Sequence, residues 1–520
     1  MRTLVYLAAA LLAASCGGKK DDDKATPTAK PTSPDKGTGS GAAMATGSGS
    51  AAGSGSATVA DPAKPAGGTA MIPVTSKSPD AIKAFEQGRE LSDGDRGSEA
   101  IEPFKKAIGL DADFAQAHAY LGIVTPGPPG MAELDKAKTL AAKLPEPERL
   151  FIEGAHANRS GDHAAMIAAY TKVADLAPGD WRILIALGND ANDTGDNAKA
   201  IKLFEKALVV KPDLALAQDG LAYGHAGLRE LDAALAAAKK QVELLPKQPS
   251  PQDTLGEVLL LAGKYDDAEK AFQAAITIEP KYIAAWQGIE LARAYRGDWK
   301  GAFAANESRN TGAVDTYNSV EVIKDGAWLA FAAGNLPDAI ARLDVIEADV
   351  EAKKTPAYAF AALDRAMMLQ LSEKYPDAAK WLDTGNKRRE GLPGFTRRLI
   401  AQTHAIGVLR NAAMTATAAP DADKLIGGLD KDAAASGDPL SKSFAAWGHG
   451  LAAWAKTGAK DAVTELAKCR VQLLACRYDL AAAQRKAGDA AGADATEKQI
   501  REAPQREASA VYFVGQFPKK

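Results

Sequence analysis

One fixed spacing constrains this chain of 520 residues more than any other feature. Four prolines, Pro178, Pro212, Pro246 and Pro280, follow one another at steps of 34 residues. Four alanines, at positions 200, 234, 268 and 302, keep the same step. A period of this length is typical of an array of helical hairpins. We therefore expect a repeated helical structure instead of one compact core.

A single period, from Trp181 to Leu214, shows how such a hairpin is encoded. Small and apolar residues recur at helical spacing up to Ala191, and Gly195 then stops the first helix. Ala200 and Phe204 lie on the stripe of a second helix, which ends before Pro212. One hairpin cannot bury its apolar face alone, so each unit must stack on a neighbour.

These residues resemble the tetratricopeptide repeat family, whose pattern is W-x2-L-G-x2-Y, then A-x3-F, then P. Leu187-Gly188, Ala200-x3-Phe204 and Pro212 match this pattern. The units at 249–282, 81–114 and 147–180 match it wholly or in part, and those at 215–248 and 283–316 lack the large aromatic residue. Beyond Thr316 the spacing loosens, and further units are expected near 320–353, 359–391 and 474–507.

The resemblance implies an all-α fold, an α-solenoid of tetratricopeptide hairpins that forms a right-handed superhelix behind a disordered linker. We expect four segments along the chain. They are a signal peptide at 1–15, a lipidated cysteine and linker at 16–75, the solenoid at 76–391, and a degenerate helical region at 392–520.

The N-terminus has the pattern of an export signal. Arg2 precedes an apolar run from Leu4 to Ala14, which is too short to span a bilayer. Ala14-Ser15-Cys16 resembles a bacterial lipobox, so Cys16 is the expected lipidation site, and an ordinary signal peptide is the alternative. Gly17 after the cysteine favours the outer membrane, facing the periplasm or the cell surface, by analogy with enteric lipoproteins.

The linker and the overall charge limit the possible partners. Residues 17–75 are almost free of large apolar side chains, so they cannot offset the entropy of folding and should act as a tether. The formal net charge of −3 argues against nucleic acid, which requires a basic surface.

Two cysteines remain if Cys16 carries lipid. Cys469 and Cys476 would lie too far apart to bridge on one unbroken helix, but the repeat register places a loop near 473–475. A disulfide is therefore expected. Two buried free thiols or a metal site are the alternatives, and the spacing is not that of zinc ligands.

The sequence contains no His-Glu-x-x-His motif, no phosphate-binding loop that ends in Gly-Lys-Ser or Gly-Lys-Thr, and no Gly-x-Ser-x-Gly elbow. We therefore expect no enzyme activity, no metal site and no cofactor.

In the family, the first helix of each hairpin lines a concave groove, and this resemblance assigns the candidate binding residues. Amide, acidic and aromatic groups in such a groove suit an extended peptide, because amides can pair with a peptide backbone. The expected groove residues are Phe151, Asn158, Arg159, Asn189, Asn192, Tyr223, Asp253, Glu257, Gln287 and Tyr295.

The sequence thus favours a non-catalytic scaffold of the bacterial cell envelope that binds peptide segments or partner proteins. Two alternatives stay open. One is an envelope enzyme, or an enzyme-regulating lipoprotein, with its activity in the irregular 392–520 region. The other is a structural spacer without a partner.

Overall fold

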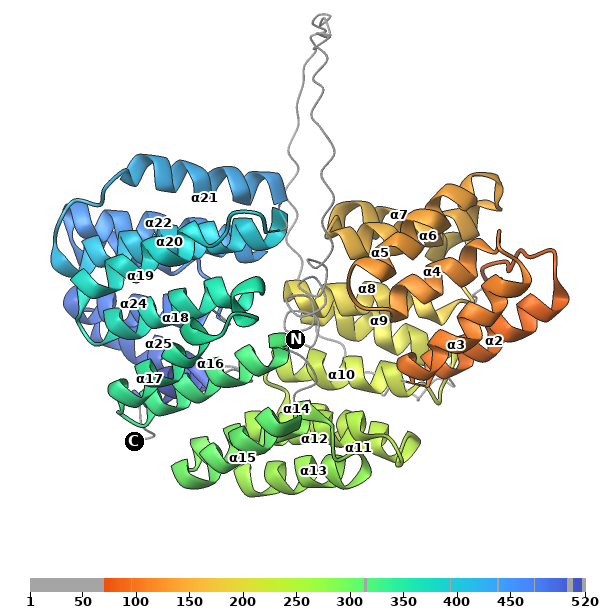
Figure 1. Ribbon diagram of the computed structural model, residues 1–520, viewed down its shortest axis with the longest axis horizontal. Helices are drawn as coiled ribbons and strands as arrows, with labels where there is room; N and C mark the ends of the chain where they lie inside the picture. The colour runs from red at the N-terminus through yellow and green to blue at the C-terminus, as the bar shows by residue number, and fades with distance from the viewer. Residues whose placement is uncertain are drawn as a thin grey trace, which may run out of the picture. The chain divides into compact units, whose positions relative to one another are not determined.

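The computed structural model describes residues 70–516, apart from 95, 313–315, 393, 437–438, 472 and 503–507. The described residues form helices, turns and extended connections, and no strand occurs among them (Figure 1). The expected signal peptide, Cys16 and the linker up to residue 69 lie outside the described part of the chain.

Nine helical hairpins occur in the described residues from 79 to 387, and the two helices of each hairpin pack against each other. Their bounds are α2 (Pro79–Asp93) and α3 (Gly97–Leu110), α4 (Ala115–Val124) and α5 (Gly127–Leu140), α6 (Glu146–Ser160) and α7 (His163–Leu176), α8 (Trp181–Thr194) and α9 (Asn197–Val210), α10 (Ala215–Gly227) and α11 (Leu231–Leu244), α12 (Pro249–Leu261) and α13 (Tyr265–Ile278), α14 (Ile283–Tyr295) and α15 (Trp299–Gly312), α16 (Thr316–Ala332) and α17 (Leu336–Ala348), and α18 (Ala357–Leu371) and α19 (Tyr375–Lys387).

Seven helices follow within the described residues, and the first two depart from the hairpin pattern. The long α22 packs against α20, α21 and α23, whereas α20 packs less extensively against α21 than against α22. The pattern of paired helices returns with α22 and α23 and continues with α24 and α25. The bounds are α20 (Gly394–Thr415), α21 (Ala422–Ser436), α22 (Pro439–Thr457), α23 (Ala459–Leu466), α24 (Leu474–Lys486), α25 (Ala490–Glu502) and α26 (Ala508–Gly515).

The turn between α8 and α9 has the predicted cause. Gly195 ends α8 with φ 85°, and its N–H donates to the carbonyl of Asn192. Asp196 then caps α9 by accepting a hydrogen bond from the backbone N–H of Lys199. Glycine suits this position because the left-handed conformation is strained for residues that carry a Cβ.

Packing between hairpins depends on large rings that face glycines. Phe204 of α9 is fully buried, and an added Cβ at Gly188 of α8 or Gly220 of α10 would lie only 2.6 or 2.3 Å from its ring. Phe272 lies in the same way between Gly256 and Gly288, where the distances are 2.6 and 2.4 Å. The predicted register of the regular units is therefore confirmed by their packing.

The hairpin of α4 and α5 was not predicted from the repeat pattern. Its first helix has only 10 residues. Glycines stand at the contact between the two helices, where the repeat pattern has an alanine and an aromatic residue. An added Cβ at Gly130 would lie 2.0 Å from the carbonyl oxygen of Thr125, and one at Gly122 would lie 2.6 Å from Leu134. The backbones approach so closely here that the family pattern is lost while the hairpin remains.

The predicted loop between the two C-terminal cysteines is present. Cys469 follows α23 and Cys476 lies in the first turn of α24. The two residues form a disulfide, with their Cα atoms 6.5 Å apart. Both side chains are buried in the apolar cluster that α20, α22, α23 and α24 share.

None of the helices in the described part of the chain is both long enough and apolar enough to span a bilayer.

Candidate peptide-binding face

The residues expected to line a groove lie on the first helices α6, α8, α10, α12 and α14, as the family resemblance requires. Their exposure differs widely. Asn158 and Asn189 are exposed, and Arg159, Asn192, Tyr223, Gln287 and Tyr295 are half-buried, whereas Phe151, Asp253 and Glu257 are buried.

The three buried residues are not available to a ligand in this structure. Phe151 is 5% exposed and stacks between the rings of Tyr120 and Tyr170. Asp253 and Glu257 are 0% and 6% exposed on α12. Their assignment to an open groove was therefore wrong. The cause is that first helices of neighbouring hairpins also pack against one another, and positions on that contact are covered.

Several of the half-buried residues connect neighbouring hairpins. The guanidinium of Arg159 donates to the carbonyl oxygen of Thr125 at 2.7 Å. The amide of Asn192 donates to the carbonyl oxygen of Gly220 at 2.9 Å, and that of Gln287 donates to Asp325 at 3.1 Å. These side chains hold one hairpin against the next, and this role uses the hydrogen-bonding groups that a peptide would need.

Asn158 and Asn189 remain as accessible amides on successive first helices. Neither makes a side-chain hydrogen bond to the described residues, and both side chains are exposed. An exposed amide offers one acceptor and two donors, which match the carbonyl and N–H groups of an extended backbone. These two residues are the part of the predicted groove that is free to contact a ligand.

The array also holds an extended segment of its own chain. Residues 70–77 have no regular secondary structure and lie against the starts of α4 and α6. The side-chain amide of Gln116 donates to the carbonyl oxygen of Pro73. Glu148 accepts hydrogen bonds from the backbone N–H and the hydroxyl of Thr75, at 3.3 and 2.7 Å.

The extended segment is fixed at both of its ends as well. The N–H of Gly179 donates to the carbonyl oxygen of Ala70 at 2.9 Å, and Asp111 accepts from the backbone N–H of Lys77 at 2.9 Å. Gln116 and Glu148 are almost wholly buried beneath the segment. Sequence reasoning missed this site, because the two residues that contact the backbone come from the irregular second hairpin and from the third.

A polar cluster is buried where the aromatic residue of the repeat is missing. Asn306 stands one repeat after Phe272, and its amide donates to Glu290 at 3.0 Å and to the carbonyl oxygen of Val322 at 3.0 Å. Arg309 donates to Asp325 at 2.6 Å and lies 3.5 Å from Glu290. Burial raises the pKa of Glu290 to about 7, against the opposing effect of Arg309. The network joins α14, α15 and α16 by polar contacts in place of an apolar ring.

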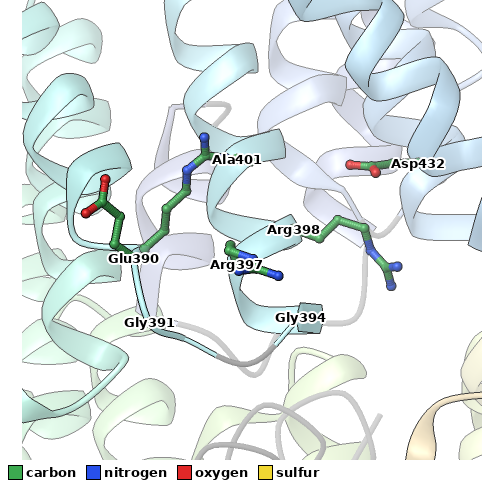
Figure 2. A pocket seen from close by; sticks show the side chains of 8 residues that line it. Glu390, Gly391, Gly394, Arg397, Arg398, Ala401 and Asp432 are labelled. Atoms are coloured by element: carbon green, nitrogen blue, oxygen red, sulfur yellow. The ribbon is translucent and has the colours of Figure 1, made fainter. Parts of the chain in front are cut away.

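A hollow lined by arginines lies at the start of α20 (Figure 2). Arg389, Arg397 and Arg398 contribute three cations, and Glu390 and Asp432 contribute two carboxylates. Figure 2 shows Asp432 on the opposite side of the hollow from Glu390. The lining residues include no hydroxyl, thiol or imidazole side chain, and the excess of cations over carboxylates favours an anionic group.

Histidine, cysteine and carboxylate side chains do not gather into a metal-binding group of three or more within the described residues. Five of the six histidines each lie within 3 Å of a carboxylate oxygen, and they are His118, His156, His163, His225 and His449. These pairs are ordinary contacts between neighbouring helices or turns.

The fold and this face define an all-α array of helical hairpins. The sequence profile described as "Tetratricopeptide repeat" matches residues 253–282, which hold most of α12, all of α13 and the turns after them, so this part of the array is a tetratricopeptide repeat.

A curated relative shares part of this sequence. The chain is 25% identical over 141 residues to the small glutamine-rich tetratricopeptide repeat-containing protein 2 of Mycosarcoma maydis. The match covers 27% of this chain and 40% of the relative, so it spans less than half of that protein.

Solved structures of repeat proteins are similar to parts of the array. A tetratricopeptide repeat protein from Parabacteroides merdae is 15% identical, with a TM-score of 0.38, and the match covers 50% of this chain and 98% of that one. MamA is 28% identical, with a TM-score of 0.28, and the match covers 31% of this chain and 93% of that one.

Proposed function

We propose that this protein is a non-catalytic scaffold that binds extended peptide segments of other proteins along the first-helix side of its array. The observation that carries the proposal is the segment 70–77, which the array holds through the backbone. Gln116 supplies an amide donor and Glu148 a carboxylate acceptor. The array thus already binds the backbone of an extended segment through buried polar side chains.

Asn158 and Asn189 extend this chemistry to the open part of the first-helix face. Both are exposed amides on α6 and α8, the hairpins next to the site of the bound segment. Main-chain hydrogen bonds give such a site affinity for many sequences, and neighbouring side chains give selectivity. A neutral or basic peptide fits best, because Asp219 on the following first helix is a carboxylate that would repel an acidic one.

We propose that the protein lies in the bacterial cell envelope, anchored by lipid at Cys16, with the tether giving the array its reach. The support is the sequence of the N-terminus, in which a basic start, a short apolar run and Ala14-Ser15-Cys16 follow one another. The outer membrane is the proposed site, and other envelope proteins are the proposed partners.

An affinity pull-down from solubilised envelope tests the function, with the full chain and its tether as bait. We expect the variant Asn158→Ala with Asn189→Ala to capture at least about tenfold less of any partner than the unaltered chain. Gln273→Ala removes an exposed amide from the second helix α13 and is the matched control, with capture unchanged. Equal capture by all three chains would contradict the proposed face, and no capture by the unaltered chain would contradict the scaffold itself.

A further inference from the structure

The C-terminal helix α26 does not simply extend the array. Its sequence, Ala-Ser-Ala-Val-Tyr-Phe-Val-Gly, carries no charge. It packs chiefly against α16 and also contacts α14, α24 and α25. Three of these four, α14, α16 and α24, are the first helices of their hairpins, so α26 lies on the same kind of face that holds the candidate peptide site.

Aromatic contacts fix α26 on this face. The ring of Tyr512 stacks on Phe331 of α16, with 4.6 Å between centroids. The ring of Phe513 lies 6.4 Å from that of Trp328 and 5.5 Å from that of Tyr478. The two contacts with α16 join residues about 180 positions apart in the sequence.

Apolar burial completes the contact. Ala510, Val511 and Phe513 are 3–4% exposed. Val511 belongs to the core cluster of α14, α16 and α18, whereas Ala510 and Phe513 join Leu474 and other apolar residues in a second cluster. The face beneath α26 is therefore an apolar surface lined by aromatic rings, and it fits one short helix.

A helix of eight residues has little stability of its own in water. The contacts of α26 with the face must therefore hold it in place. Its covalent connection to the chain also contributes, because it keeps the effective concentration of α26 at the face high. A segment of another protein that makes the same contacts competes with α26 on equal chemical terms. Its apparent affinity falls by the fraction of time for which α26 is bound.

We propose that the face formed by α14, α16 and α24 is a second binding site, specific for a short uncharged helix that presents adjacent Tyr and Phe side chains, and that α26 is its resident occupant. The partner is a protein segment of this chemistry. The inference rests on the proposed scaffold function and names the kind of helix that this part of the array recognises.

The test uses a fluorescent peptide with the sequence of residues 503–517 and the full chain. The first variant, Tyr512→Ala with Phe513→Ala, weakens the resident helix and leaves the face intact. We expect this variant to bind the peptide at least about tenfold more tightly than the unaltered chain in fluorescence anisotropy. A peptide with both aromatics replaced by alanine is the matched control, and no binding is expected. Failure of the folded variant to bind the native peptide would overturn the proposal.

Hydrogen exchange of the unaltered chain supplies a readout that needs no variant. The amides of α26 should exchange faster than those of α16 and α24, and excess native peptide should speed them further. Protection of α26 equal to that of α16, unchanged by the peptide, would show a fixed element of the core and overturn the proposal. A pull-down that depends on Asn158 and Asn189 while the peptide fails to bind would overturn this inference and leave the scaffold function standing.

Discussion

Phe204 offers the sharpest test of how the hairpins hold together. Its side chain comes from α9 and fills the space between α8 and α10, with no exposed surface. Gly188 and Gly220 face the ring from either side. Substitution Phe204→Ala would leave a cavity whose walls include two glycines, which have no side chains that could move to fill it.

The expected cost follows from this geometry. Large-to-small changes of buried phenylalanine cost about 3–5 kcal/mol, and the higher values belong to sites that cannot collapse. We expect Phe204→Ala to lower the free energy of unfolding by about 4–5 kcal/mol. The control is Val209→Ala on the same helix, where the side chain is 58% exposed and the change should stay within about 0.5 kcal/mol.

A double variant distinguishes this account from a general loss of packing. The Cβ of an alanine at position 220 would lie 2.3 Å from the Phe204 ring, so Gly220→Ala alone should be strongly destabilising. In the Phe204→Ala background the same methyl group enters the vacated space. We expect the effects of the two changes on the free energy of unfolding to be non-additive by about 1–3 kcal/mol. The double variant should be more stable than the sum of the two single effects predicts.

The assay must follow individual hairpins, because repeat arrays unfold without strict two-state behaviour. Urea melts give the total change, and native-state hydrogen exchange shows where it falls. Protection should drop in α8, α9 and α10 and stay unchanged in α18. Additive effects, or an equal loss along the whole array, would refute the role given to the ring.

Three further predictions follow from buried or terminal groups. Burial raises the pKa of Glu290 from its ordinary 4.5 to about 7, so this carboxyl ionises at a lower pH in the unfolded chain than in the folded one. The free energy of unfolding should therefore fall by about 3 kcal/mol as the pH rises through that range. Glu290→Gln should therefore be more stable than the unaltered chain in urea melts at about pH 8 and not at about pH 4, and an equal difference at both would contradict the assignment. The bridge between Cys469 and Cys476 encloses a short loop, with a sequence separation of 7, and its reduction should cost about 2–3 kcal/mol. Thiol labelling of the exported, unfolded and unreduced chain should find neither cysteine free. Mass spectrometry of the mature N-terminus should find a diacylglyceryl group on Cys16, and a mature chain that starts elsewhere without lipid would end that proposal.

Where the sequence follows the repeat pattern, it predicts the structure closely. Gly195, Ala200, Phe204 and Pro212 locate both helices and the turn of their hairpin, and the structure has α8 and α9 at those positions. The candidate site was only partly predictable. Asn158 and Asn189 are exposed as expected, but the contacts that bury Asp253 and Glu257 leave no mark on the helical pattern.

The sequence by itself determined the hairpins, because helix periodicity and the glycine and proline punctuation act over one repeat. Tertiary structure decided which first-helix residues remain accessible, where residues 70–77 lie, and that Tyr512 stacks on Phe331. The physical reason is that these contacts depend on the rotation from each hairpin to the next, added over many repeats. A local sequence pattern is enough to form each hairpin. It does not determine the total rotation along the array, which decides whether distant segments come into contact.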